Sequence, residues 1–286
     1  MSAIIRRDLS YHRDPVWRRF DIDSLDNRDS ELIHRICDRV DRAMDVWHRP
    51  EISGVAAIPD GPGLYVANHN GGWWTPDTWI FCSAVLRERG LHDVPYGLGH
   101  EFAISVRPMH EYLVRLGAVR ASHSNGQRLF ERGNKVLVYP GGDEDALRPW
   151  RHRNRIVFGG RTGYIRLALT SGVPIIPVVA QGAHSSLIVI DDMKWLARLI
   201  RADKVLRVKV WPLTLSVPFG LTLGPPPPFI PLPVSIQMRV LDAIHFDRTG
   251  PEAADDPEYV TWCDARVREA MQSALTEMAT GFGPSS

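Results

Sequence analysis

The chain has 286 residues, of which 44% are hydrophobic and 23% are charged, so it is long enough to bury a full hydrophobic core. Lys and Arg number 34 against 33 Asp and Glu, and the resulting net charge of +1 indicates no general attraction to nucleic acid. The mean hydropathy of −0.17 argues against an integral membrane protein, and the ordinary apolar content argues against disorder.

The three cysteines, Cys37, Cys82 and Cys263, are far apart and fit neither a disulfide framework nor a zinc site. They therefore favour a reducing, cytosolic compartment. The first residues contain too short an apolar run for a signal peptide.

In chain order, the predicted elements alternate between helices and short apolar strands. Residues 1–29 are charged and aperiodic and predict an irregular N-terminal arm, whereas apolar residues recur every three or four positions from residue 30 and predict an amphipathic helix. Beyond it, we expect strands at 63–69, 134–142 and 173–182, helices at 75–90, 162–172 and 256–280, and further candidate strands at 204–217 and 234–244.

Local signals mark several of these boundaries. Thr75 is expected as the N-cap of the second helix, while Gly90 and Gly172 follow the predicted ends of two helices. Strands that alternate with helices predict one α/β domain over residues 30–280, with a mainly parallel central sheet flanked by helices and an N-terminal amphipathic helix. Residues 281–286 are expected to be a frayed tail.

Residues 210–238 form a long stretch without a charged side chain, and it contains eight prolines. So many prolines exclude the internally hydrogen-bonded helix that a membrane span requires. Two interpretations remain, namely edge strands and loops packed on the core, or an apolar flap that contacts lipid or lines an acyl channel. The preceding residues 194–209 carry six Lys and Arg against one Asp, which suits either an anionic membrane surface or a solvated charged face.

The first segment with candidate chemistry is NHNGGWWTPD, residues 68–77. His69 directly follows a predicted strand, Asp77 lies in the first turn of the next helix, and glycines between them let the backbone double back. A carboxylate beside one ring nitrogen fixes the tautomer and leaves the other nitrogen to accept a proton. Taken singly, His69 is more typical of a hydrogen-bonded structural residue, and Asp77 of a charge that serves the helix dipole, so it is the pair across a glycine-rich turn that indicates a site.

The second segment is VLVYPGGDEDALRPW, residues 136–150. Its Pro-Gly-Gly exposes backbone N–H groups suited to an oxyanion or a phosphate, although a simple tight turn explains the glycines as well. Asp145 and several arginines follow, and a solvated loop is the alternative interpretation of the arginines. In a third segment, VPIIPVVAQGAHSS, the prolines are expected to shape a core strand.

Together these segments resemble the lysophospholipid and glycerolipid acyltransferase superfamily, the phosphatidate-forming acyltransferases, and they are nearer its diacylglycerol acyltransferase-like branch. The resemblance covers about residues 52–245. It rests on four blocks in the family's order, namely NHNGGWWTPD, LGAVRASHSNGQRLFERG, VYPGGDEDALRPW with FGGRTGYIRLALTSG, and VPIIPVVAQGA.

The chain departs from the family pattern in three places. Seven residues separate His69 from Asp77, where the family has four. His123 aligns with an Arg that the commoner pattern uses for glycerol phosphate, with Arg120 near it but not equivalent. Pro-Gly-Gly replaces the common Pro-Glu-Gly, as in the neutral-lipid branch.

The resemblance implies direct acyl transfer. His69, oriented by Asp77, would remove the proton from a lipid hydroxyl as it attacks the thioester of acyl-CoA or acyl-carrier protein, and no metal or other cofactor is implied. The residues expected to bind substrate are Gly141, Gly142, Asp145, Arg148, Arg161, Arg120, Trp73 and Trp74. Among these, backbone donors near the glycines would stabilise the developing oxyanion or position the acceptor head, and the arginines would bind phosphate. The tryptophans would contact the acyl chain, although plain core packing explains them equally well.

Two other functions remain open. A lipid esterase or hydrolase fits the likeness of NHNGGWW to a His-Gly-Gly oxyanion loop, but the G-x-S-x-G motif of that class is absent. A non-catalytic lipid-binding protein fits the lengthened turn between His69 and Asp77. We expect a cytoplasmic protein, attached peripherally at the inner face of a membrane, with lipid and not nucleic acid as its partner.

Overall fold

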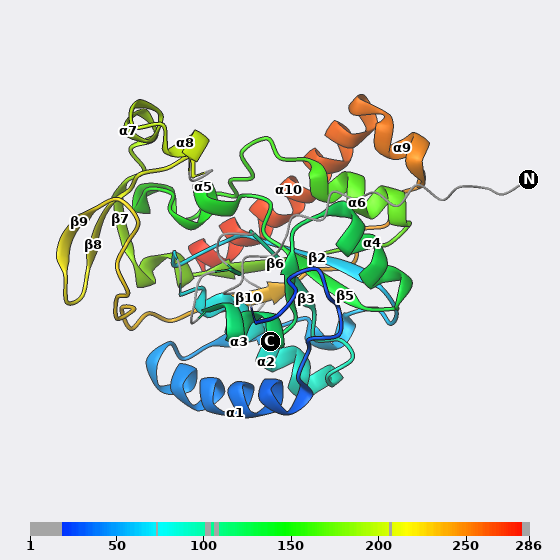
Figure 1. Ribbon diagram of the computed structural model, residues 1–286, viewed down its shortest axis with the longest axis horizontal. Helices are drawn as coiled ribbons and strands as arrows, with labels where there is room; N and C mark the ends of the chain where they lie inside the picture. Colours follow the sequence, from blue (N-terminus) through cyan, green and yellow to red (C-terminus); the bar gives the residue numbers. More distant parts are fainter. Residues whose placement is uncertain (1–18, 73, 101–103, 106–108, 206–207, 282–286) are drawn as a thin grey trace, which may run out of the picture.

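A seven-stranded sheet forms the centre of the computed structural model, which describes residues 19–72, 74–100, 104–105, 109–205 and 208–281 (Figure 1). Its strands are β1 (Glu51–Ser53), β2 (Gly63–Ala67), β3 (Tyr96–Gly99), β4 (Ala118–Arg120), β5 (Lys135–Val138), β6 (Ile175–Gln181) and β10 (Gln237–Val240). They lie in the order β1-β10-β6-β2-β5-β3-β4, and all neighbours run parallel except β10 and β6. The prediction of an α/β domain with a mainly parallel sheet is confirmed.

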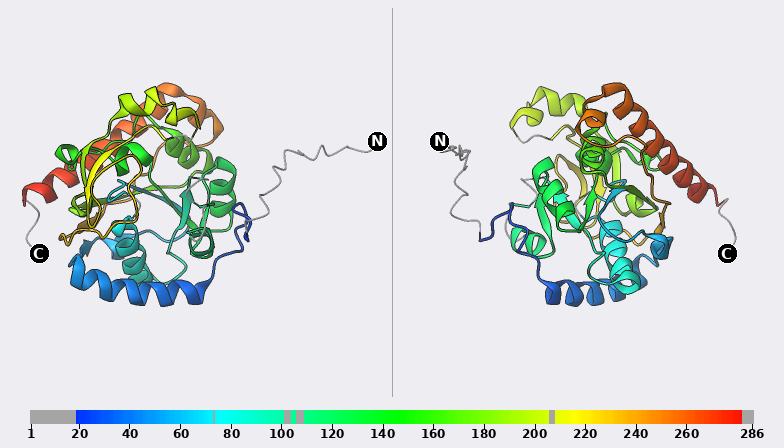
Figure 2. Two further views of the ribbon diagram at one scale, coloured as in Figure 1. Left: turned by 60° about the vertical axis from the view of Figure 1, so that its left-hand side comes forward. Right: turned by 90° about the vertical axis from the view of Figure 1, so that its right-hand side faces the viewer.

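Successive side chains of a strand point to opposite faces of the sheet, and here both faces carry apolar side chains. Helices cover both faces. Leu64 and Val66 of β2 belong to the core on one face, and Tyr65 and Ala67 to the core on the other. The first core is covered by α4 (His123–Glu131), α6 (Gly163–Ser171), α9 (Pro251–Asp255) and α10 (Pro257–Thr280), the second by α1 (Ser30–Trp47) and α2 (Pro76–Arg89). In both views of Figure 2, α1 and the pair α9–α10 lie on opposite sides of the molecule.

Most helix boundaries follow the local sequence signals. The side chain of Asp29 accepts a hydrogen bond from the N–H of Leu32 at the start of α1, and Asp256 caps α10 in the same way. Gly172 ends α6 in a left-handed conformation, with a φ of 63°. Thr75 occupies the expected N-cap position of α2 but makes no capping hydrogen bond, because its left-handed backbone (φ 42°) is not the extended conformation that capping requires.

The predicted N-terminal arm is only partly within the described residues. Ile22 and Leu25 are buried, and the carbonyl of Ile22 accepts a hydrogen bond from the N–H of Arg120. The described part of the arm therefore packs on the domain. Residues 1–18 and the predicted tail from residue 282 lie outside the described residues.

The shortest elements have no recognisable sequence periodicity. They are the helices α3 (Met109–Arg115), α5 (Gly142–Ala146), α7 (Lys194–Leu199) and α8 (Ala202–Val205), and the single turns η1 (Val55–Ala57), η2 (Trp150–His152) and η3 (Ala183–Ser186). Two turns of helix or fewer are too short for an amphipathic pattern to be distinguished from chance.

A second, antiparallel sheet contains part of the charge-free stretch. Its strands are β7 (Ile188–Asp191), β8 (Leu213–Ser216) and β9 (Gly220–Leu223), in the order β7-β8-β9. Figure 1 shows it at one end of the molecule, beside α7 and α8. No helix in the described ranges is long and apolar enough to cross a membrane.

Candidate active site

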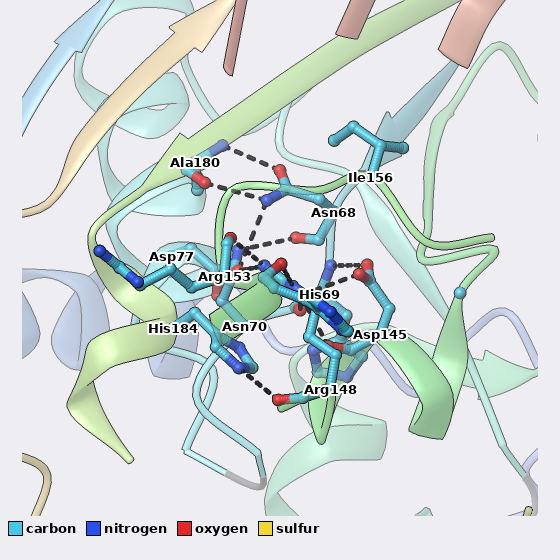
Figure 3. Close-up of polar contacts among 12 residues, drawn as sticks. Asn68, His69, Asn70, Asp77, Asp145, Arg148, Arg153, Ile156, Ala180 and His184 are labelled. Carbon is cyan, nitrogen blue, oxygen red and sulfur yellow. Dashed lines mark hydrogen bonds and ion pairs between the residues drawn. The ribbon is translucent and has the colours of Figure 1, made fainter. Parts of the chain in front are cut away.

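The candidate site lies where three neighbouring parallel strands end. His69 follows β2, Tyr139 follows β5, and His184 follows β6, which pairs with β2 on the other side. Because the carboxyl ends of parallel strands share one edge of the sheet, residues far apart in sequence meet there. Figure 3 shows the resulting cluster of polar side chains.

His69 is a half-buried residue, and its imidazole lies against the ring of Tyr139, with 4.6 Å between ring centroids. Tyr139 is itself held by a hydrogen bond of 2.6 Å between its hydroxyl and that of Thr78. Within the described parts of the chain, the buried Nδ1 atom of His69 has no hydrogen-bond partner. Burial, assisted by the charge of Arg148, lowers the pKa of His69 to about 4. The ring is therefore neutral at physiological pH and can accept a proton.

Both peptide groups of His69 are held by one buried ion pair. The N–H of His69 donates to Oδ2 of Asp145 at 2.6 Å, and its carbonyl accepts from Nη1 of Arg148 at 2.8 Å. Asp145 and Arg148 are fully buried and lie 2.8 Å apart. Burial raises the pKa of Asp145 to about 6 although Arg148 opposes the shift, so the carboxylate is mostly ionised at neutral pH.

Arg148 donates only to protein acceptors. They are the carbonyls of His69, Asp145, His152 and Arg153, the carboxylate of Asp145 and the side-chain oxygen of Asn70, at 2.6 to 3.2 Å. These contacts occupy the five N–H groups that a guanidinium has. The side chain of Arg148 is therefore buried and fully hydrogen-bonded against the His69 loop, whereas the sequence led us to expect a contact with a substrate phosphate.

Among the described residues, Asp77 makes no hydrogen bond to the ring of His69, which is the contact that the sequence predicted. It accepts hydrogen bonds from the side-chain amide of Asn70 at 2.8 Å and from the N–H of Thr78 at 3.0 Å, and no described hydrogen bond joins it to His69. The carboxylate is instead engaged by Asn70, which lies within the same lengthened turn. Burial raises the pKa of Asp77 to about 7, and the hydrogen bond from Asn70 opposes this rise.

The Pro-Gly-Gly turn is tightly packed. A Cβ atom at Gly141 would lie 2.2 Å from the Cβ of Asp145 and 2.2 Å from the carbonyl oxygen of Val157, so only glycine fits there. The N–H of Gly142 donates to the carbonyl of Tyr139 at 3.1 Å. In this structure the Gly142 N–H is thus engaged within the turn, in contrast to its expected role as an oxyanion donor.

Arg161 lies over the outside of the same turn. It donates to the carbonyls of Pro140 and Gly141 and forms ion pairs with Asp143 at 3.0 Å and Glu144 at 3.2 Å. Its guanidinium thus stabilises the turn, which differs from the phosphate contact expected from the sequence.

The remaining predicted substrate-binding residues are dispersed. Arg120 ends β4, at the far edge of the sheet, and donates to Asp23 at 2.5 Å. Trp74 is exposed near the His69 turn, and Trp73 lies outside the described residues. The described residues contain no group of three or more His, Cys, Asp or Glu side chains that could hold a metal ion.

Sequence reasoning missed four residues that build the site. The side chain of Asn68 pairs with both backbone groups of Ala180 at 2.9 Å and extends the contact between β2 and β6, while Asn70 links Asp77 to Arg148. Tyr139 contacts the His69 ring, and the buried ring of His184 contacts the carbonyl of Arg148. The available signal was the pair of asparagines on either side of His69.

Comparison with known proteins finds one matching family model. The family model described as Acyltransferase matches residues 49–181, a segment that contains His69, Asp77 and the Pro-Gly-Gly turn. A solved structure, the 1-acyl-sn-glycerophosphate (LPA) acyltransferase PlsC from Thermotoga maritima, has a TM-score of 0.54 and 15% identity, and the match covers 86% of this chain and 79% of that one. This likeness shows the shared fold.

Two curated relatives extend the comparison. An uncharacterised protein of Mycobacterium tuberculosis is 28% identical over 236 residues, which cover 82% of this chain and 63% of the relative. The "DGAT1/2-independent enzyme synthesizing storage lipids" of Gallus gallus is 25% identical over 191 residues, which cover 65% of this chain and 54% of that protein. The chain thus spans less than two thirds of the length of these relatives.

Proposed function

We propose that this chain, part of which matches the family model described as Acyltransferase, is an acyltransferase that moves a fatty acyl group from a thioester donor to a hydroxyl of a glycerolipid or lysophospholipid. The proposed donor is acyl-CoA or acyl-carrier protein. The observation that carries the proposal is the half-buried His69, whose neutral imidazole lies at the carboxyl edge of the sheet within the segment that matches the acyltransferase family model.

In the proposed reaction, His69 acts as the general base. Its free ring nitrogen takes the proton of the lipid hydroxyl while the hydroxyl oxygen attacks the thioester carbonyl. The C–O bond forms, the C–S bond breaks, and the imidazolium returns its proton to the departing thiolate. A ring with a pKa of about 4 holds the proton weakly, which favours that return. General-base assistance is typically worth ~10²–10⁴-fold in rate.

Asp77 is proposed to act through its charge rather than by direct contact with His69. Its ionised form places a negative charge in a buried environment, where a charge stabilises a transient imidazolium more strongly than it would in water. The amide of Asn70, fixed by Arg148, stabilises that ionised form. Asp145 and Arg148 are positioning residues, since they hold the peptide groups of His69.

The proposed chemistry needs no metal or other cofactor besides the acyl thioester. Because the acceptor is a lipid, the proposal includes peripheral attachment to a membrane surface on the cytoplasmic side.

The direct test is incubation of the purified full chain with labelled acyl-CoA or acyl-carrier protein and a panel of lysophospholipid and diacylglycerol acceptors. A labelled ester product supports acyl transfer. Free fatty acid released from an ester substrate, without transfer, would instead identify a hydrolase. Neither product across the panel, with lipid binding retained, would identify a non-catalytic lipid-binding protein.

A further inference from the structure

The β8–β9 hairpin buries polar side chains and exposes apolar ones, which is the reverse of the pattern expected for a sheet with one face in water. Thr214 of β8 is fully buried, and its hydroxyl shares a hydrogen bond of 2.8 Å with that of Thr222 on β9. The alternate positions point outward, and there Leu215, Leu221 and Leu223 expose 44%, 62% and 56% of their surface. Because strand side chains alternate, the hairpin turns its hydroxyls inward and its leucines outward.

This exposure extends beyond the hairpin. Ten of the seventeen exposed large hydrophobic side chains in the described residues lie between Ile190 and Ile230, so the apolar surface is gathered in one region. Figure 1 shows α7 and β7–β9 together at one end of the molecule. We call this region the docking face, represented by Trp195, Leu199, Leu215, Phe219, Leu221 and Leu223.

The charges around the docking face are arranged for an anionic partner. Residues 210–238 carry no charge, whereas three exposed cations adjoin them, namely Arg198 on α7, Arg201 between α7 and α8, and Lys204 on α8. The acids at the end of β7 have cationic neighbours, since Asp191 pairs with Arg151 and Asp192 with Lys194. An uncharged apolar face beside exposed cations matches the boundary between acyl chains and phosphate headgroups of a bilayer.

The docking face is connected to the candidate active site. Val189 of β7 and the buried Leu187 and Val210 pack against Ala146 and Leu147 in the segment after the Pro-Gly-Gly turn. A Cβ atom at Gly72, in the His69 turn, would lie 3.1 Å from Leu187.

Ion pairs make a second connection. Lys194, at the start of α7, and Lys209, just before β8, both pair with Glu144 beside the Pro-Gly-Gly turn, at 3.3 Å and 2.9 Å. The elements that carry the docking face are therefore packed against the segments that carry the candidate site.

We propose that the docking face inserts into the surface of an anionic lipid bilayer. The leucines and aromatic residues of β8–β9 and α7 enter the acyl boundary, while Arg198, Arg201 and Lys204 contact lipid phosphates. This deepens the proposed function by naming the surface through which lipid reaches the site, and it does not depend on the transfer reaction taking place.

Flotation of the purified full chain with vesicles tests this surface. Vesicles of phosphatidylcholine mixed with phosphatidylglycerol should carry the protein upward, more strongly than vesicles of phosphatidylcholine alone, and added salt should weaken the binding. The double variant Leu221→Ser/Leu223→Ser should reduce binding to both vesicle types by about tenfold or more. The double variant Arg198→Glu/Arg201→Glu should reduce binding to the anionic vesicles selectively.

Two controls make the result specific. Trp262→Ser removes an exposed aromatic side chain on α10, away from the second sheet, and should float like the wild-type protein. His69→Gln should also float normally, so that loss of transfer is distinguished from loss of docking. Circular dichroism should show the same fold for every variant.

Either of two outcomes would overturn the proposal. In one, the wild-type protein does not bind anionic vesicles. In the other, Leu221→Ser/Leu223→Ser floats normally but changes the oligomeric state measured by light scattering, which would make the docking face a protein interface.

Discussion

Arg148 donates a hydrogen bond of 2.8 Å to the carbonyl oxygen of His69, across 79 residues of sequence. The same guanidinium pairs with Asp145, which accepts the N–H of His69. Because both peptide groups of the histidine are bound in this way, the segment after β5 fixes the position of the imidazole. The segment around His69 and the segment that follows β5 thus form one structural unit.

Replacing His69 with Gln should reduce acyl transfer by ~10²–10⁴-fold, because the variant lacks the proposed general base. The melting temperature should change little, since the backbone contacts of residue 69 remain. The measurement is the initial rate of labelled ester formation. His92→Gln, at an exposed histidine, is the matched control, and undiminished turnover by His69→Gln would show that another group takes the proton.

The rate of acyl transfer should rise with pH through a midpoint near 7. Asp77, with a pKa of about 7, ionises over this range, while His69, with a pKa of about 4, is already neutral. Asp77→Asn should lower the rate at pH 8 and abolish the rise in rate that is centred near pH 7. The measurement is a pH–rate profile of both proteins. If Asp77→Asn keeps the rise in rate near pH 7, Asp77 is not the group whose ionisation causes it.

Asn70→Ala should move the same midpoint to higher pH. The amide of Asn70 donates to the ionised carboxylate, so its removal disfavours ionisation and raises the pKa of Asp77 further. The rate should therefore fall at pH 7 and recover in part at pH 9. Asn134→Ala, at the opposite end of β5, should leave the midpoint in place. An equal loss of rate at every pH would contradict the link to Asp77.

Asp77 should also make the free energy of unfolding depend on pH. The ordinary pKa of an aspartate, which applies to the unfolded chain, is 3.8, whereas the pKa of Asp77 in the fold is about 7, so between these values the folded state holds a proton that the unfolded state has released. Stability from this residue is complete below pH 3.8 and is lost as pH rises toward 7, by about 2 kcal/mol between pH 5 and pH 7. Urea unfolding of Asp77→Asn should lack this decline, and parallel pH profiles for variant and wild type would contradict it.

Arg148→Met should destabilise the fold strongly. It leaves the fully buried Asp145 and several carbonyls without their cationic partner, and breaking a buried pair in this way costs ~3–5 kcal/mol. Arg151→Met, at an exposed arginine, should change stability by less than ~0.5 kcal/mol. Urea unfolding of both variants gives the comparison. Equal stability of the two variants would show that the Arg148 network is dispensable.

The sequence by itself determined the alternation of strands and helices, several helix boundaries and the turns that carry His69 and Pro-Gly-Gly. These features depend on neighbours within a few residues, such as the spacing of apolar side chains or a glycine after a helix, as at Gly172. The outward leucines of β8–β9 were not predictable in the same way, because alternation alone does not say which face of a strand is buried.

Only the tertiary structure decided which polar groups meet at the site. The sheet order places β2 between β5 and β6, and this brings Asp145 and Arg148 to the peptide groups of His69. A hydrogen bond requires atoms within about 3 Å, and whether groups more than 70 residues apart reach that distance depends on strand order and register. Local sequence patterns contain neither quantity.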